Sequence, residues 1–225
     1  MLGTLVNVGA IVLGTAVGLL LRKGLPQRMQ EALMAGVGLC TLLIGMKGAL
    51  GTESEMLVIL SVVLGAVVGA LLKIEERLDR LGKRLEKRFA GEDNGTFGKG
   101  FVTASLMFCV GAMAIVGSMD AGLRGDHSTL FAKAVLDGVI SIVFASTLGA
   151  GVMLSAASVL VYQGSITLLS TLVAPLLTAR VITEMSAVGG VLIIGVGLNM
   201  IRKDHLPVGN VLPAVFAPLL LTMWM

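Results

Sequence analysis

Charged and aromatic side chains are scarce in this sequence. Of its 225 residues only 14% are charged and 4% are aromatic, whereas 56% are hydrophobic. A soluble domain could not hide so large an apolar fraction in one core. The composition therefore excludes an ordinary soluble protein and makes the lipid bilayer the solvent for most of the chain.

Several chemical signatures are missing as well. Cys40 and Cys109 both fall within apolar runs, so we expect small buried side chains rather than a disulfide. His127 and His205 lie far apart with no Cys or second His at ligand spacing, so we assign no metal site. No glycine-rich loop ends in Gly-Lys-Ser/Thr, and no nucleophile stands at a readable spacing from a base. We therefore expect neither an enzyme, nor a cofactor, nor a nucleic-acid partner.

What the sequence has instead is a series of long apolar runs. About 17 helical residues can just cross the roughly 30 Å of bilayer hydrocarbon, and thirty glycines suit helices that pack closely. We therefore predict an all-α fold, a polytopic transmembrane helical bundle. It has about eight spans: Leu2–Leu21, Glu31–Leu50, Met56–Leu72, Phe101–Gly117, Ala134–Gly149, Val152–Leu177, Ala187–Ile201 and Val211–Met225.

Two spans carry local features of their own. Gly14 and Gly18 form a Gly-xxx-Gly face on the first span, for which we prefer close packing within the chain over a self-association surface. Pro213 and Pro218 interrupt the hydrogen bonding of the last span, so we expect this helix to be kinked or tilted.

The segment Lys73–Phe89 differs from the rest. Eleven of the 17 residues of its sequence, KIEERLDRLGKRLEKRF, are charged, and apolar residues recur every three or four positions. This pattern predicts an amphipathic helix, whose basic excess suits the cytoplasmic headgroup surface. The alternatives are a solvated helix that packs on its own protein and a contact with a second subunit. The glycine-rich residues 91–100 complete a linker over residues 73–100.

The charges of the loops predict the orientation in the membrane. Placing both termini outside puts thirteen Lys and Arg residues in the cytoplasmic loops and four in the outer ones, as the positive-inside rule requires. We therefore expect residues 1–225 to form a single membrane domain in a bacterial cytoplasmic membrane.

A weak internal similarity relates the two halves of the chain. A shift of 102 residues lays the first two spans on the fourth and fifth without a gap, matching Arg22 with Arg124 and Gly36 with Gly138. One interpretation is an inverted repeat of three spans each, with residues 1–73 as the first copy and 101–177 as the second, followed by two extra spans within 187–225. Inverted repeats are common in secondary transporters. The other interpretation is a chance match within a biased composition.

Asp137 is the only carboxylate set inside a long apolar run. An ionised carboxylate in hydrocarbon costs about 2.5–3.5 kcal/mol on insertion scales, so it usually faces a polar cavity or a partner. One interpretation places Asp137 about one turn into its helix, where the helix dipole favours an anion and Lys133 can pair with it. The other makes it a cation or proton site, with hydroxyl ligands from Ser141 and nearby helices.

Other polar residues are candidates for the same site. Four of them lie within predicted spans, where they either form helix-to-helix hydrogen bonds or share an aqueous cavity: Asn7, Tyr162, Gln163 and Asn199. Around the outer loop between the fourth and fifth spans, charged residues are either solvated or form a vestibule that selects a substrate by charge: Asp120, Arg124, Asp126 and Lys133.

Three stretches resemble a known family. They are GTLVNVGAIVLGTAVGLLL, ALMAGVGLCTLLIGM and above all GSMDAGLRGDHSTLFAKAVLDGVISIVFASTLGAGV. Together with the rest of the chain they are similar to the bacterial inner-membrane family known as domain-of-unknown-function family 554. The resemblance implies a polytopic protein of the bacterial cytoplasmic membrane and a transport function. It carries over no functional residue.

These observations favour a gradient-driven secondary transporter or channel for a small ion or metabolite, acting as a homo-oligomer, with Asp137 as its ion or proton site. The alternative is a non-transporting membrane scaffold or sensor that acts through residues 73–89. If the intramembrane polar residues line one cavity, transport is favoured. If each pairs privately with a neighbouring helix, the scaffold is favoured.

Overall fold

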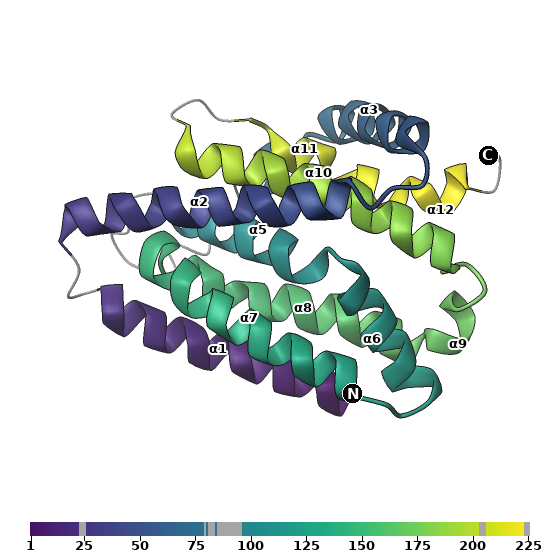
Figure 1. Cartoon of the computed structure of the whole chain (residues 1–225), viewed down its shortest axis with the longest axis horizontal. Coiled ribbons are helices and arrows are strands. Elements are labelled where there is room, and N and C mark those ends of the chain that lie inside the picture. Colours follow the sequence, from purple (N-terminus) through teal and green to yellow (C-terminus); the bar gives the residue numbers. More distant parts are fainter. Residues whose placement is uncertain (23–25, 79, 81–83, 85–95, 203–205, 223–225) are drawn as a thin grey trace. The chain divides into compact units, whose positions relative to one another are not determined.

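The protein is described by a computed structural model over residues 1–22, 26–78, 80, 84, 96–202 and 206–222 (Figure 1). Within these residues every regular element is a helix, which confirms the predicted all-α class. The elements in chain order are α1 (Leu2–Arg22), α2 (Gln27–Ala49), α3 (Glu55–Leu71), α5 (Thr96–Cys109), α6 (Ala112–Leu123), α7 (Ser128–Leu148), α8 (Gly151–Leu168), α9 (Ser170–Val173), α10 (Ala179–Ile201), α11 (Val208–Val211), the 3₁₀ helix η1 (Leu212–Phe216) and α12 (Pro218–Leu221).

Five of the described helices are long and apolar enough to cross a membrane: α1, residues Glu31–Ala49 of α2, α7, α8 and α10. A sixth candidate consists of α5 and α6 together, which meet at an angle of 59°. The helix α3 and the segment Val208–Leu221 are shorter apolar pieces. The polytopic helical bundle is thus confirmed, whereas the predicted count of about eight spans is not.

Two helices begin earlier than predicted. α7 begins at Ser128 instead of Ala134, and α10 begins at Ala179 instead of Ala187. The predicted boundaries followed the charges, because a charged residue at the start of an apolar run indicates a loop. In the structure Lys133 and Glu184 are buried inside these helices, where each has a hydrogen-bonding partner. Burial with a partner allows the helix to extend past the charge.

The fourth span, predicted over Phe101–Gly117, is not one continuous helix in the structure. α5 ends at Cys109 and α6 begins at Ala112, with Gly111 between them at a φ of 127°. Glycine adopts this backbone conformation readily because it has no Cβ. Non-helical backbone at membrane depth is tolerated where it is buried in protein or lines an aqueous cavity.

The predicted last span is bent, as its prolines indicate. Residues Leu212–Phe216 form the 3₁₀ helix η1, with Pro213 in its first turn, and Pro218 begins α12. A proline at the first turn of a helix loses no internal hydrogen bond. The prolines therefore divide the described part of this segment into short pieces, in agreement with the interruption expected from them.

The chain forms two compact units that interleave along the sequence. Unit 1 contains α1, α5, α6, α7 and α8, and consists of Met1–Met34, Asp79–Cys109 and Met113–Leu172. Unit 2 contains α3, α10, α11, η1, α12 and most of α2, and consists of Ala35–Leu78, Val110–Ala112 and Val173–Met225.

Under the predicted shift of 102 residues, the continuous helix α1 corresponds to the broken pair of α5 and α6. The internal repeat stays a prediction.

Within unit 1, α1 and α7 pack against each other through glycines (Figure 1). A Cβ atom added at Gly14 would collide with the carbonyl oxygen of Gly138, and one at Gly18 with that of Ile142. Small residues allow such close approach of two backbones. The Gly-xxx-Gly face of α1 is thus used within the chain, as preferred from the sequence.

The same contacts show that α1 and α7 run in the same direction. Gly3 lies beside Leu130, and Gly18 lies beside Ala145, so the residue numbers rise together along both helices. Two parallel spanning helices start at the same membrane face, so an odd number of crossings must lie between them. The three predicted spans between α1 and α7 satisfy this requirement.

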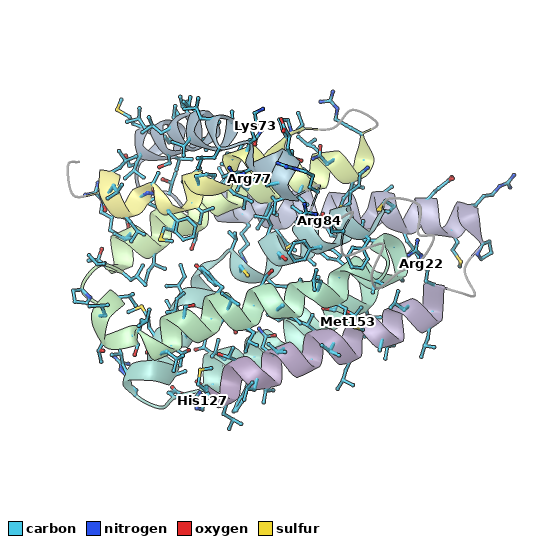
Figure 2. The ribbon with its side chains drawn as sticks, turned by 180° about the vertical axis from the view of Figure 1, so that it is seen from behind. Arg22, Lys73, Arg77, Arg84, His127 and Met153 are labelled. Carbon is cyan, nitrogen blue, oxygen red and sulfur yellow. The ribbon has the colours of Figure 1, made fainter. Side chains whose placement is uncertain are left out.

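Of the predicted amphipathic helix Lys73–Phe89, residues 79, 81–83 and 85–89 lie outside the described residues. Its first part is tied to α11 within unit 2: the backbone N–H of Gly209 donates to Glu75 Oε2 (2.6 Å), and the N–H of Glu75 donates to Asn210 Oδ1 (2.9 Å). Figure 2 labels Lys73 and Arg77 on this part. Its action on lipid or on a partner protein stays a prediction.

Candidate functional site

Four polar side chains from three helices of unit 1 meet at one place. They are Asn7 of α1, Lys133 and Asp137 of α7, and Gln163 of α8. Their exposed fractions are 0%, 6%, 3% and 0%, so all four are buried. Lys133 and Asp137 share a face because they stand four residues apart on one helix. The structure thus brings Asn7, Asp137 and Gln163 together with Lys133.

The centre of this cluster is an ion pair. Lys133 Nζ lies 2.9 Å from Asp137 Oδ1 and 2.8 Å from Oδ2, so the ammonium contacts both carboxylate oxygens. Asn7 Nδ2 donates a further hydrogen bond to Asp137 Oδ2 at 2.9 Å. The Gln163 Oε1 atom lies 3.5 Å from Asn7 Nδ2, which makes a weak contact. The carboxylate thus receives donors from both parallel helices.

Asp137 lies in the middle of its helix rather than near the end. It is nine residues from Ser128 and eleven from Leu148, which places it about 13 Å along a helix that rises about 1.5 Å per residue. The interpretation of Asp137 as a residue one turn into its helix is therefore wrong, because α7 begins earlier than its apolar run. At mid-span the end of the helix dipole is too far away to stabilise the charge.

Burial of this pair carries an energetic cost. Taking two charges out of water costs several kcal/mol per ion, and their attraction repays it only when geometry is good and the remaining polar atoms are satisfied. Here Asn7 Oδ1 and Gln163 Nε2 are buried and have no hydrogen-bond partner within the described chain. The cluster is therefore incompletely satisfied in this conformation.

Buried hydroxyl groups of unit 1 also lack hydrogen-bond partners among the described residues. Ser141, one turn after Asp137 on α7, is fully buried, and its Oγ has no partner among the described residues. A helical serine usually bonds to the carbonyl four residues before it, which Ser141 does not do. Other buried hydroxyls of unit 1 lack a described partner too: Thr4, Thr15, Ser118 and Thr167.

The last residue of α5 and a tyrosine of α8 belong to the same unit as the ion pair. Cys109, the last residue of α5, is half-buried and within electrostatic range of both Lys133 and Asp137. Tyr162 of α8 is half-buried and within electrostatic range of Cys109. The site therefore consists of a buried charge pair with unsatisfied amide and hydroxyl groups. Discontinuous helices form ion and substrate sites in many transporters.

The predicted vestibule residues divide between the cluster and the surface. Lys133 belongs to the cluster. Asp120 lies within α6 rather than on a loop, and it pairs with Arg124 at 3.6 Å on the exposed end of that helix. Asp126 accepts a hydrogen bond from the backbone N–H of Ser128 at 2.9 Å, and hydrogen bonds from the backbone and side chain of Ser128 lower the pKa of this exposed carboxyl.

These surface charges are near the start of α7, where Figure 2 labels His127 beside the beginning of α1. Arg22 marks the opposite end of α1 in the same view (Figure 2). The surface charges and the mid-span pair thus lie at different levels of unit 1. A vestibule function stays a prediction.

Asn199, also predicted as a site residue, lies in unit 2 and serves another purpose. Its side-chain Nδ2 donates to the carbonyl oxygen of Leu206, and its Oδ1 accepts from the backbone N–H of Leu206, both at 2.8 Å. This pair of bonds closes the connection after α10. Asn199 is therefore privately satisfied rather than part of the cluster.

Sequence reasoning missed Glu184 as a buried group. It has an exposed fraction of 0% within α10, and it accepts hydrogen bonds from Thr52 Oγ1 (2.6 Å) and the backbone N–H of Glu53 (2.8 Å). A usable signal was Thr178, whose side chain caps α10 by accepting from the N–H of Val181 at 3.3 Å. A threonine before a helical pattern predicts a helix start there.

The fold and the site define a polytopic α-helical membrane protein with an ion pair buried in the middle of a spanning helix. Over residues 2–223 the chain matches the family described as "Protein of unknown function (DUF554)", and it belongs to this family. The resemblance noted from the sequence is thus confirmed.

Two relatives cover almost the whole chain. The chain is 31% identical over 222 residues to "Uncharacterized membrane protein YdfK" of Bacillus subtilis (strain 168), which covers 97% of this chain and 94% of that protein. It is 30% identical over 221 residues to "Uncharacterized protein YqgA" of Escherichia coli (strain K12), with coverages of 95% and 93%. No solved structure matches. The printed name of the first relative agrees with a membrane location.

Proposed function

We propose that the protein is a secondary transporter or channel of the bacterial cytoplasmic membrane, which moves a small ion or metabolite along a gradient. The observation that carries this proposal is the convergence of Asn7, Lys133, Asp137 and Gln163 at the middle of α7. Polar groups at this depth mark ion and substrate routes in membrane proteins. The lipid bilayer and further copies of the chain are the partners we expect.

The unsatisfied atoms of the cluster support an exchange of ligands. A buried polar atom without a partner costs about 1–3 kcal/mol, and such atoms belong to Asn7 and Gln163 of the cluster and to Ser141, one turn after Asp137 on α7. A static packing role would favour complete pairing, as in Asn199. Water or a bound solute would satisfy the free atoms, so the cluster is better suited to admitting a ligand than to joining helices.

The helix break is a point at which the chain can bend. Because α5 and α6 are separated by Gly111 near Cys109, one half can move without bending a continuous hydrogen-bonded helix. Hinges of this kind absorb backbone rotation when a site opens to one side. We therefore expect α5 and α6 to move as separate pieces.

The experiment that tests transport uses purified protein in liposomes that contain the pH-sensitive dye pyranine. A panel of alkali salts, divalent salts and small metabolites is added with and without an imposed proton gradient. We expect at least one solute to move or to change the internal pH faster than in empty liposomes, and Asp137→Asn to abolish this effect. Asp120→Asn, which changes a carboxylate on the exposed end of α6, is the matched control.

Unchanged flux in Asp137→Asn would remove the assigned role of this residue. If no solute in the panel moves, the non-transporting scaffold that acts through residues 73–89 becomes the better explanation. The two functions make opposite demands on the protein, because a scaffold needs its surface helix and not its buried cluster.

A further inference from the structure

The ammonium group of Lys133 occupies the place that a transported cation would need. It contacts both oxygens of Asp137, at 2.9 and 2.8 Å, inside the protein. We propose that Lys133 is a built-in substitute for an alkali cation, and that such a cation binds Asp137 only in exchange for the Lys133 proton. This inference rests on the proposed function, because it names the substrate class and the coupling of that same site.

The atoms around Asp137 suit a hard cation. Asn7 Oδ1 and Ser141 Oγ are buried oxygens without a described partner, and they belong to the helices that pack against each other at Asp137. Carboxylate, amide and hydroxyl oxygens are the ligands that hard cations such as alkali ions prefer. An anion would need the Lys133 ammonium free, whereas Asp137 already neutralises it. The ligand set therefore favours a cation.

Charge balance makes the exchange obligatory. A cation added beside the Lys133 ammonium would leave two positive charges against one carboxylate in a buried site, which is costly. If the Lys133 N–H bond breaks and its proton leaves to water, the neutral amine stays and the cation takes its place on Asp137. One cation enters for each proton released, and the site is neutral before and after. A divalent cation would leave one positive charge uncompensated.

The other titratable groups near the pair do not compete for this role. Cys109 of α5 lies within electrostatic range of both charges, and Tyr162 of α8 lies within range of Cys109. α1 presents the amide of Asn7. A thiol, a phenol and an amide are all neutral near pH 7. The exchanged proton is therefore assigned to Lys133.

Substitution of Lys133 distinguishes this role from that of a structural salt bridge. Arginine keeps the charge but does not lose its proton, so Lys133→Arg should block cation binding. Glutamine removes the charge, so Lys133→Gln should bind the cation without competition. A structural ion pair gives the reverse ranking, in which arginine is tolerated and glutamine is harmful.

The test uses purified full-length protein in detergent. Its thermal unfolding midpoint is measured in NaCl, LiCl and KCl against choline chloride at equal ionic strength, and proton release is followed with a pH indicator in weak buffer at alkaline pH. For the wild type we expect at least one alkali cation to raise the midpoint, with about one proton released per cation bound, as the charge balance requires. We expect no response in Lys133→Arg, and a response without proton release in Lys133→Gln.

Several outcomes would overturn the inference. The first is that an alkali cation raises the unfolding midpoint of the wild type without proton release. The second is that it raises the midpoint of Lys133→Arg as much as that of the wild type. The third is that it no longer raises the midpoint of a folded Lys133→Gln. If Lys133→Gln does not fold, two other measurements decide: the number of protons that the wild type releases per cation bound, and the response of Lys133→Arg to alkali cations. If alkali cations have no effect but the liposomes still transport another solute in an Asp137-dependent way, this inference fails and the proposed function stands. If nothing is transported, both fail.

Discussion

Each compact unit buries a carboxylate inside a spanning helix, and the two carboxylates have different surroundings. In unit 1, Asp137 pairs with an ammonium and has unsatisfied amide and hydroxyl atoms around it. In unit 2, both oxygens of Glu184 are bound by neutral donors, the hydroxyl of Thr52 and the N–H of Glu53. Glu184 thereby ties α10 to the connection between α2 and α3.

The difference shows that burial alone does not identify a functional acid. Glu184 is more completely buried than Asp137, yet its hydrogen bonds hold a loop in place. The presence of an exchangeable positive partner and of free polar atoms separates the candidate site from the structural one.

The largest effect is expected at Asp137. Asp137→Asn should reduce solute flux in liposomes to the level of empty vesicles and destabilise the fold, because removing one partner of a buried pair costs about 3–5 kcal/mol. The double variant Lys133→Gln with Asp137→Asn removes both charges, so it should recover much of the thermal stability but none of the flux. Full flux in Asp137→Asn would erase the distinction between the two acids.

A smaller effect is expected at the contact that holds Asn7 against α7. A Cβ at Gly14 would collide with the carbonyl oxygen of Gly138, so Gly14→Ala should destabilise the protein by about 1–3 kcal/mol. Gly9→Ala is the matched control, because a Cβ there meets no described atom within 4 Å. Thermal unfolding in detergent compares the two variants. Equal unfolding midpoints would contradict the close packing of α1 on α7.

Glu184→Gln should affect stability and leave transport almost intact. Glutamine keeps one acceptor oxygen but loses the other, so we expect a loss of about 1 kcal/mol, the usual net value of one hydrogen bond. The flux should stay within about twofold of the wild type, on the reasoning that its role is confined to the loop. A loss of flux as complete as in Asp137→Asn, in a folded variant, would make Glu184 a second transport acid.

The smallest effect is expected at the surface pair of Asp120, which is half-buried, and Arg124, which is exposed; the two are 3.6 Å apart. Exposed ion pairs contribute about 0–1 kcal/mol. Asp120→Asn should therefore leave both the unfolding midpoint and the flux near their wild-type values. A clear change in the charge preference of transport would instead support the predicted vestibule.

Much of the fold and part of the site follow from the sequence for physical reasons. Long apolar runs must form helices in lipid, because backbone groups there have no water to bind. Asn7, Asp137 and Gln163 were predicted as intramembrane polar groups that need partners, and the structure brings them together. The pairing of Lys133 with Asp137 was also expected from their spacing.

The remaining features depend on tertiary contacts that a local pattern does not contain. A charge within an apolar run marks a loop unless a partner is known, so the early starts of α7 and α10 were missed. Asn199 looks like Asn7 in the sequence, but its partner Leu206 is local whereas that of Asn7 is on another helix. The break at Gly111 could not be distinguished from the other glycines, since most of them serve close packing.

The central claim is that water or a solute reaches the ion pair. The thiol of Cys109 can report whether water reaches this part of unit 1. In a Cys40→Ala background, Cys109 is the remaining cysteine of the sequence. It can be treated in liposomes with a charged, water-soluble methanethiosulfonate reagent. We predict that the reagent modifies Cys109 in the folded Cys40→Ala protein and does so more slowly in the presence of a transported solute. A thiol that resists the reagent from both sides of the membrane, but reacts after unfolding, would contradict the account.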